Sequence, residues 1–455
     1  MFRYLTNYRF YTMAKCGFGL AYLWYVWDFL RIHLAIWNQL SYLLPPPSDI
    51  AFSGNPHWDI YLRSLAIFMN GKTVVWVFCL ASPFAVVLFI WGRHRRLQMA
   101  VGCWMSFSMI SLNALIGVFT STADIWLNLA FVFYSLTALI SSTAEWEKNE
   151  PGFNFGKWRA DPALNSVYAW LIVLLQFSVY FFAGINKLVD GWQPWTTGVA
   201  LQNLAFDSSM HEFARGTQVP YWISLILCYV TLLQRLVVPF AFYFQRYRFW
   251  SVLILGSMHI GYAILMYVNI FPLIGMASLL MVLPPRTGPQ IEAPLVPLAK
   301  AKSKLNCGSR PSSIQKGVIY ICAAWLLLES ARLTVFKPTP WENKLMIVPA
   351  WRMFADGGVS AGGKWRLVLD TPRGDVDATD IPLRLLPQIW RDRFYIDTIF
   401  HDIEGNNVGT NSLVCRLLAE TERAYGVQQV QISGDPAVLG SAFDIYRRKS
   451  GVETK

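Results

Sequence analysis

The chain has 455 residues, of which 54% are hydrophobic and only 15% are charged, and its mean hydropathy is +0.35. A soluble protein usually carries about a quarter charged residues, so this composition excludes an ordinary soluble globular class. The net charge of +11 comes from short basic clusters between apolar runs, which is not the pattern of a nucleic-acid-binding surface, and no nucleic-acid partner is expected.

Long apolar runs recur through the first three quarters of the chain, and several approach or exceed the ~20 residues that a helix needs to cross a bilayer. The sequence predicts an all-α polytopic membrane protein with about eight or nine transmembrane helices. The expected spans are 11–34, 73–92, 97–119, 122–143, 165–188, 219–243, 248–266, 269–284 and 314–334. They form a transmembrane domain over 1–335, in which a flexible linker at about 285–313 precedes the last span.

Basic residues between the runs predict the orientation, since cytoplasmic loops carry an excess of Lys and Arg. If the N-terminus is cytoplasmic and every segment crosses, all the basic clusters lie inside: Arg3, Arg9 and Lys15; Arg93, Arg95 and Arg96; Arg246 and Arg248; Arg286, Lys300, Lys302, Lys304 and Arg310. Asn269 and Pro272 leave 248–284 open as two crossings or as one crossing with a re-entrant hairpin. Two crossings place the C-terminal tail outside the cell or inner membrane, and one crossing places it in the cytoplasm.

The composition changes after about residue 350. The segments 364–370 and 427–432 alternate between apolar and polar residues as strands do, whereas 384–400 and 411–425 have helical patterns. We therefore expect a small C-terminal α+β extramembrane domain over 336–455.

Ionisable side chains inside the expected spans are functional candidates by default, because burying them in a bilayer is costly. They are Asp28, Arg31, Asp124, Lys187, Arg235, His259 and Glu329. Most of these lie near span ends, where hydrogen bonding between helices or mutual pairing is the simpler explanation. His259 interrupts an otherwise apolar run, so it faces either protein or a cavity, and core and catalytic roles both stay open. One intramembrane histidine gives no basis for a metal site.

Lys187 stands at the end of the apolar run 167–182, directly after Asn186. One interpretation is a snorkelling anchor, whose stem lies in lipid while its ammonium reaches the headgroups. The other is a base, because a lysine held in a water-poor setting loses its proton more readily. Ala183 and Gly184 precede it and would let another helix approach closely.

Four separated motifs carry a resemblance to a known family. The segment 181–188 (FFAGINKL), followed by Trp192 and by 198–201 (GVAL), resembles the signature span of the HTTM family, which includes the vitamin K-dependent γ-carboxylases. The further motifs follow in the family's order: Pro239 closing a span, then His259, then Phe271 and Met276 in a run that ends at Pro284, and W-R-M-F at 351–354.

The resemblance implies an activity and a set of site residues. In the carboxylases the lysine that matches Lys187 deprotonates vitamin K hydroquinone, dioxygen converts the anion into a strong base that removes a γ-proton from a peptide glutamate, and carbon dioxide traps the carbanion. The cofactor implied is therefore vitamin K hydroquinone or a related naphthoquinol, with O2 and CO2 and without a metal. Membrane lipid and a peptide or protein substrate are the implied partners. The catalytic residues implied are Lys187 and His259, and the residues implied to line the cofactor pocket are Asn186, Trp192, Asp124 and Met276.

Some positions depart from the family pattern. Asp124 stands where the carboxylases have a histidine, Asn186 replaces the first lysine of a pair, and Arg235 stands where many members have an acidic residue. The tail is also shorter than that of the animal enzymes. These departures keep a second hypothesis open, in which the chain is a non-carboxylating HTTM protein that assists maturation or export of a small secreted peptide, or binds a lipid or peptide. Transport is the third hypothesis, although no inverted repeat supports it.

Overall fold

A computed structural model describes most of the transmembrane part of the chain and three strands of the tail. The described residues are 5–39, 72–92, 94–116, 122–150, 152–160, 163–190, 192–204, 211, 213–214, 217–266, 270–284, 312–336, 366–371, 374–377 and 429–433. This part of the chain is mostly helical and contains little sheet.

Every expected span contains a helix. The helices are α1 (Tyr8–Gln39), α3 (Lys72–Trp91), α4 (Arg95–Ile116), α5 (Thr122–Ile140), α8 (Val167–Asp190), α11 (Tyr221–Leu236), α12 (Arg248–Leu265), α13 (Phe271–Val282) and α14 (Ser313–Val335). The shorter helices between them are α6 (Thr143–Asn149), α7 (Phe155–Ala160), α9 (Trp192–Thr196) and α10 (Val199–Leu204). By length and composition, five helical stretches of the described residues could cross a membrane: 122–140, 167–189, 221–243, 248–265 and 313–335.

Local sequence signals explain where several helices begin and end. Ser312 accepts a hydrogen bond from the backbone N–H of Gln315, whose side chain accepts one from the backbone N–H of Ser312, and this capping box starts α14. α11 ends at Leu236 and the chain continues as a 3-10 helix, Val238–Tyr243, because Pro239 has no N–H to donate to the α-helical ladder.

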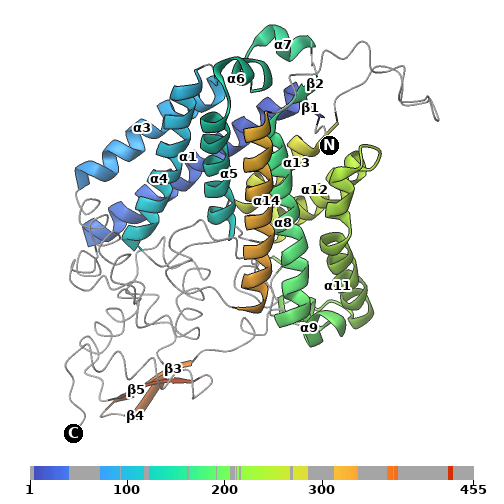
Figure 1. The fold of residues 1–455 in the computed structure, drawn as a ribbon. Coiled ribbons are helices and arrows are strands. Elements are labelled where there is room, and N and C mark those ends of the chain that lie inside the picture. Colours follow the sequence, from blue (N-terminus) through green and yellow to red (C-terminus); the bar gives the residue numbers. More distant parts are fainter. Residues whose placement is uncertain are drawn as a thin grey trace.

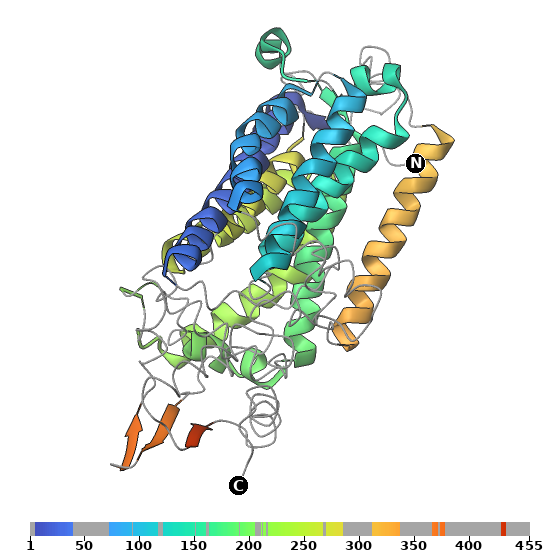
Figure 2. The ribbon, with the colours of Figure 1, turned by 90° about the vertical axis from the view of Figure 1, so that its left-hand side faces the viewer.

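Two helices form the centre of the bundle. The apolar windows of α5 and α8 are 78% and 83% buried, whereas the windows of α11 with its 3-10 extension, α12 and α14 are each 28% buried. α5 packs on α4 and α8, and α8 also contacts α11, α13 and α14. Figure 1 shows α8 in the middle of the molecule with α14 beside it, and Figure 2 shows α14 at the edge of the bundle and α1 beside α3. The side chains available for an enclosed site therefore belong to α5, α8 and the faces packed on them.

The two ends of the bundle carry different structures (Figure 1). At the end where the chain starts, β1 (Leu5–Asn7) pairs antiparallel with β2 (Ala163–Asn165), and α6 and α7 lie nearby. At the other end α9 and α10 follow α8 and contact α11.

Two of the three described strands in the tail lie where strands were expected. β3 (Arg366–Thr371) pairs antiparallel with β4 (Gly374–Asp377) on one side and β5 (Gln429–Ser433) on the other. The predicted strands at 364–370 and 427–432 are thus confirmed as β3 and β5. The helices expected at 384–400 and 411–425 and the motif at 351–354 lie outside the described residues.

Candidate functional site

The helices α8 and α11 touch at Gly184, just before Lys187. A Cβ on Gly184 would lie 2.9 Å from Cδ2 of Leu236 and 3.1 Å from Cβ of Arg235. No larger residue fits without moving α11, so the close approach expected from the sequence is present. This contact brings side chains of α11 alongside the face of α8 that carries Lys187.

Lys187 is fully buried at the end of α8. Its Nζ lies 4.5 Å from the centroid of the Trp195 ring on α9, within the range of a cation–π interaction. Around this pair lies a small apolar cluster of Trp195, Ala200, Cys228 and Leu232, with Leu188 and Leu201 packed against it. A snorkelling anchor would reach the surface, so the burial of Lys187 supports its interpretation as an internal amine.

Two neighbours of Lys187 were also expected in the site. Asn186 is 2% exposed and therefore lies inside the protein beside Lys187. Trp192 begins α9, but its side chain lies outside the described part of the structure. The indole that the structure places against the lysine is that of Trp195.

His259 lies on α12 at the meeting point of four helices. Its Nε2 lies 2.5 Å from the hydroxyl of Tyr180 on α8. Its ring lies 5.0 Å from the Phe271 ring on α13 and 6.3 Å from the Trp126 ring on α5, measured between centroids. The imidazole packs directly on α13, because a Cβ on Gly275 would lie 2.1 Å from its Cε1. His259 thus faces protein on every helix around it and is fully buried.

Arg235 lies between the lysine and the histidine. It is 2% exposed, and its Nη2 donates a hydrogen bond of 2.6 Å to the hydroxyl of Tyr262 on α12. Its charge also interacts with Tyr180 and His259. Hydrogen bonding between helices was one explanation that the sequence offered for Arg235, and its bond to Tyr262 links α11 to α12 in this way.

Lys187 and Tyr180 are seven residues apart on α8, or nearly two turns, so they share one face about 10 Å apart. One group consists of Lys187, Trp195 and the packed face of α11. The other group consists of His259 and its contacts Tyr180, Trp126 and Phe271. The structure places these two groups along the same side of one helix.

Two further expected residues lie on α5 and α13. Asp124 is buried in the first turn of α5 and interacts electrostatically with Tyr25 of α1. Met276 lies on α13, and its sulfur is 3.6 Å from the position that a Cβ would occupy on Gly256 of α12. Within the described residues, no three His, Cys, Asp or Glu side chains gather where they could hold a metal ion.

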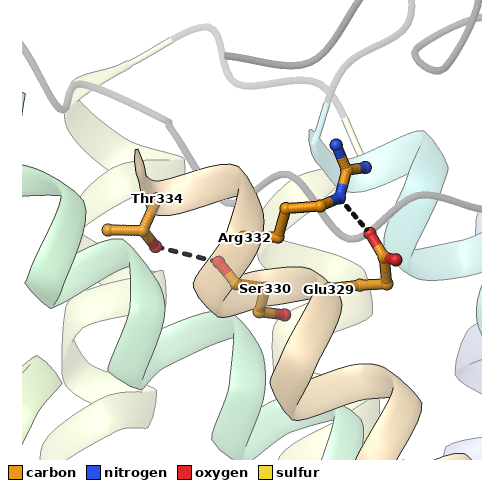
Figure 3. Close-up of polar contacts among 4 residues, drawn as sticks. All are labelled: Glu329, Ser330, Arg332 and Thr334. Atoms are coloured by element: carbon orange, nitrogen blue, oxygen red, sulfur yellow. Dashed lines mark hydrogen bonds and ion pairs between the residues drawn. The ribbon is translucent and has the colours of Figure 1, made fainter. Parts of the chain in front are cut away.

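On α14 the expected explanation of Glu329 holds. Its carboxylate lies 2.7 Å from Nε of Arg332, and both side chains are about one third exposed (Figure 3). The next turn shows a second local contact, in which the Thr334 hydroxyl donates to the backbone oxygen of Ser330 (Figure 3). The Ser330 hydroxyl also lies 2.8 Å from that of Ser178, which joins α14 to α8.

A second buried polar group, which the sequence did not indicate, lies at the end of the bundle where the chain starts. Lys15 donates a 3.0 Å hydrogen bond to Tyr134, and Tyr134 donates one of 2.8 Å to Gln98. Next to them, Glu150 accepts hydrogen bonds from Tyr11 at 2.5 Å and from Ser166 at 2.7 Å. We call Lys15, Tyr134, Gln98, Tyr11, Glu150 and Ser166 the Lys15–Glu150 cluster.

Sequence reasoning missed the Lys15–Glu150 cluster because each member looked ordinary in its own segment. In the sequence Lys15 is one of several basic residues at the start of the first span, and Glu150 lies in a polar segment between two spans. Burial raises the pKa of the Glu150 carboxyl, although the hydrogen bonds from Tyr11 and Ser166 oppose the shift. The one available signal was the run of tyrosines at positions 4, 8 and 11 of the first segment, which could supply hydroxyl donors.

Comparison with known proteins adds no identification: no protein-family model, curated protein or solved structure matches the chain.

Proposed function

We propose that this chain is an integral membrane protein of the HTTM type, with eight or nine crossings, and that it resembles the vitamin K-dependent γ-carboxylases in activity. It would couple the oxidation of a lipid quinol by O2 to the carboxylation of a peptide glutamate. The observation that carries the proposal is the complete burial of Lys187 against the Trp195 ring in an otherwise apolar cluster. A base that deprotonates a hydrophobic acid, such as a lipid quinol, needs this combination of an amine and apolar, aromatic surroundings.

The surroundings of Lys187 fit a flat aromatic ligand. Trp195 offers a ring face beside the amine, and Cys228 and Leu232 supply apolar surface from α11. A naphthoquinol, when bound, supplies with O2 the strong base that removes the glutamate γ-proton before CO2 adds.

In this mechanism Lys187 accepts the hydroxyl proton of the quinol at Nζ. The Trp195 ring holds the resulting ammonium in place, since a ring face attracts a cation. Lys187 has no solvent-exposed area, so the protein shields the site from water. This shielding matters because water would quench a strong base before the base met glutamate.

His259, the second proposed catalytic residue, is oriented by Tyr180 and by the backbone at Gly275. Asn186 stands beside the base and would bind a quinol oxygen. Asp124, Met276 and Trp192 are proposed as further lining residues.

We infer that the N-terminus is cytoplasmic and that the tail lies outside. The end of α12 is joined to the segment after α10 by a hydrogen bond from the His211 N–H to the Leu265 oxygen, and α13 returns to contact β1. The segment 248–284 therefore starts and finishes on the same side of the membrane as the N-terminus, and the end of α12 lies on the opposite side. This supports the two-crossing alternative. α14 then carries the chain to the opposite side.

One observation favours the second hypothesis, in which the chain binds a lipid or peptide without quinol chemistry. Arg235 is buried where many family members carry an acid, and a buried cation suits the binding of an anionic ligand.

The deciding experiment uses purified protein in nanodiscs with reduced naphthoquinone, O2 and labelled bicarbonate. Quinone epoxide is followed by mass spectrometry, with and without glutamate-containing peptides. Epoxide that forms in the wild-type protein and is lost in Lys187→Ala supports the proposal. Folded wild-type protein that forms no epoxide with any of several quinols would contradict it and favour the binding function.

A further inference from the structure

Arg235 is a buried cation that has a single hydrogen-bonding partner in the part of the chain that the structure describes. The guanidinium is 2% exposed, and within the described residues its hydrogen bonding is limited to the Tyr262 hydroxyl, which leaves Nε without an acceptor. Arg332 on α14 shows the usual arrangement: it is partly exposed and its Nε lies 2.7 Å from the Glu329 carboxylate (Figure 3). A guanidinium stays charged at any physiological pH, so a buried one requires a negative partner to offset its lost hydration.

Three more nitrogen atoms near Arg235 lack partners among the described residues. These are Nε1 of Trp126, Nδ1 of His259 and Nε2 of Gln176, all completely enclosed, and Oε1 of Gln176 lacks a partner as well. The Trp126 ring lies 6.1 Å from the Tyr180 ring, which in turn interacts with the Arg235 charge, so the atoms belong to one neighbourhood. The indole and guanidinium nitrogens can only donate, and His259 donates from Nδ1 when the Tyr180 hydroxyl donates to Nε2. A ligand that satisfies this set must offer acceptors.

We propose that Arg235 is the anchor of an internal binding site for a carboxylate-type oxyanion, with Trp126 and His259 as further donors. A single guanidinium balances one negative charge, which favours a monoanion over a phosphate dianion. Planar carboxylate and hydrogencarbonate ions accept at each oxygen and match the donors of a guanidinium. The ligand could come from a glutamate side chain of a peptide or from dissolved hydrogencarbonate, since both present this chemistry. Binding of an anion at this site requires no quinol chemistry, and the site is additional to the proposed role of Lys187.

The test measures the thermal stability of the whole protein in nanodiscs, without quinol, as probes are titrated. The probes are sodium bicarbonate and N-acetyl-glutamate amide, with N-acetyl-glutamine amide and inorganic phosphate as comparisons at equal ionic strength. A ligand that binds only the folded state raises the unfolding temperature in a saturable manner. We expect saturable stabilisation by at least one carboxylate-type probe and none by the glutamine analogue, and the probe that binds identifies the source.

Variants assign the effect to Arg235. Arg235→Met should weaken binding by roughly 30-fold or more, because removing one member of a buried charge pair usually costs more than a tenfold change in affinity. Tyr262→Phe removes the phenol that positions Arg235 and should weaken binding several-fold, so it remains informative if Arg235→Met does not fold. Arg332→Met, the matched control, should leave affinity unchanged.

Three outcomes would overturn the site. They are the absence of saturable stabilisation of the wild-type protein by either carboxylate-type probe, equal affinity in wild type and in Tyr262→Phe and Arg235→Met, and tighter binding of phosphate than of both carboxylates. Because the titration contains no quinol, failure of the epoxide assay leaves this result unaffected, and the two proposals fail separately.

Discussion

Lys187 Nζ lies 4.5 Å from the centroid of the Trp195 ring, and the lysine has no exposed area. This relationship separates two interpretations that the sequence leaves equal. A snorkelling lysine would direct its ammonium outward, to the surface. The Lys187 ammonium instead faces the Trp195 indole of α9 inside the protein. The first prediction therefore concerns its chemistry.

Replacing Lys187 by Ala or by Arg should lower the rate of quinone epoxide formation by about 100-fold or more, the range in which general bases contribute. Arginine keeps the charge but cannot release its proton at neutral pH, so it fails as a base. Lys157→Ala and Lys157→Arg are the controls, because Lys157 is exposed on α7. Full activity in Lys187→Arg would refute the base role while leaving the burial of the side chain unexplained.

Gly275→Ala should destabilise the protein by about 1–3 kcal/mol, as overpacking of a filled core does. The added Cβ would lie 2.1 Å from Cε1 of His259 and 2.2 Å from its Nε2, so the imidazole must move away from Tyr180. Gly261→Ala on α12 is the matched control, since nothing lies within 4 Å of its Cβ position and alanine is the better helix former. Chemical unfolding in mild detergent measures both. Equal stability of the two variants would show that His259 is not packed against Gly275.

Glu150 should make the protein less stable as the pH rises above the ordinary glutamate value of 4.5. Burial raises the pKa of this carboxyl in the folded protein, so between 4.5 and the folded pKa the folded state holds a proton that the unfolded state has released. The stabilisation is complete below 4.5 and is lost as the pH passes through the folded pKa. Glu150→Gln removes this titration and keeps one acceptor oxygen, for either Tyr11 or Ser166, while its NH2 group can donate to the other hydroxyl.

The measurement for Glu150 is the free energy of unfolding from about pH 4 to pH 8. The wild-type curve should fall more steeply with pH than that of Glu150→Gln, and Glu145→Gln on the exposed end of α6 serves as the control. Parallel curves for wild type and Glu150→Gln would contradict the raised pKa.

The two ends of the chain should lie on opposite sides of the membrane. A fluorescent protein that folds only in the cytoplasm should be bright when fused before residue 1, and alkaline phosphatase should be active when fused after residue 455 in a bacterial host. The basic clusters and the return of α13 to β1 are the physical reasons. Phosphatase activity at neither end, or at the N-terminus, would show that the number of crossings is even or that the orientation is reversed.

Hydropathy along the chain is enough to predict the helical class and the positions of the apolar helices. The runs around 122–143 and 165–188 became α5 and α8 within a few residues, because a stretch with few charges can satisfy its backbone in an apolar core only as a helix. The alternating segments in the tail likewise became β3 and β5, which pair antiparallel.

What the polar side chains face depends on how the helices pack against one another. Tyr11 meets Glu150 across 139 positions of sequence, and His259 meets Tyr180 across 79. Hydropathy and spacing describe a residue within its own helix, whereas the partner of a buried charge depends on which helix packs against it. For this reason Lys15 and Glu150 were overlooked, and only the packed structure brought Arg235 into the core beside Tyr262.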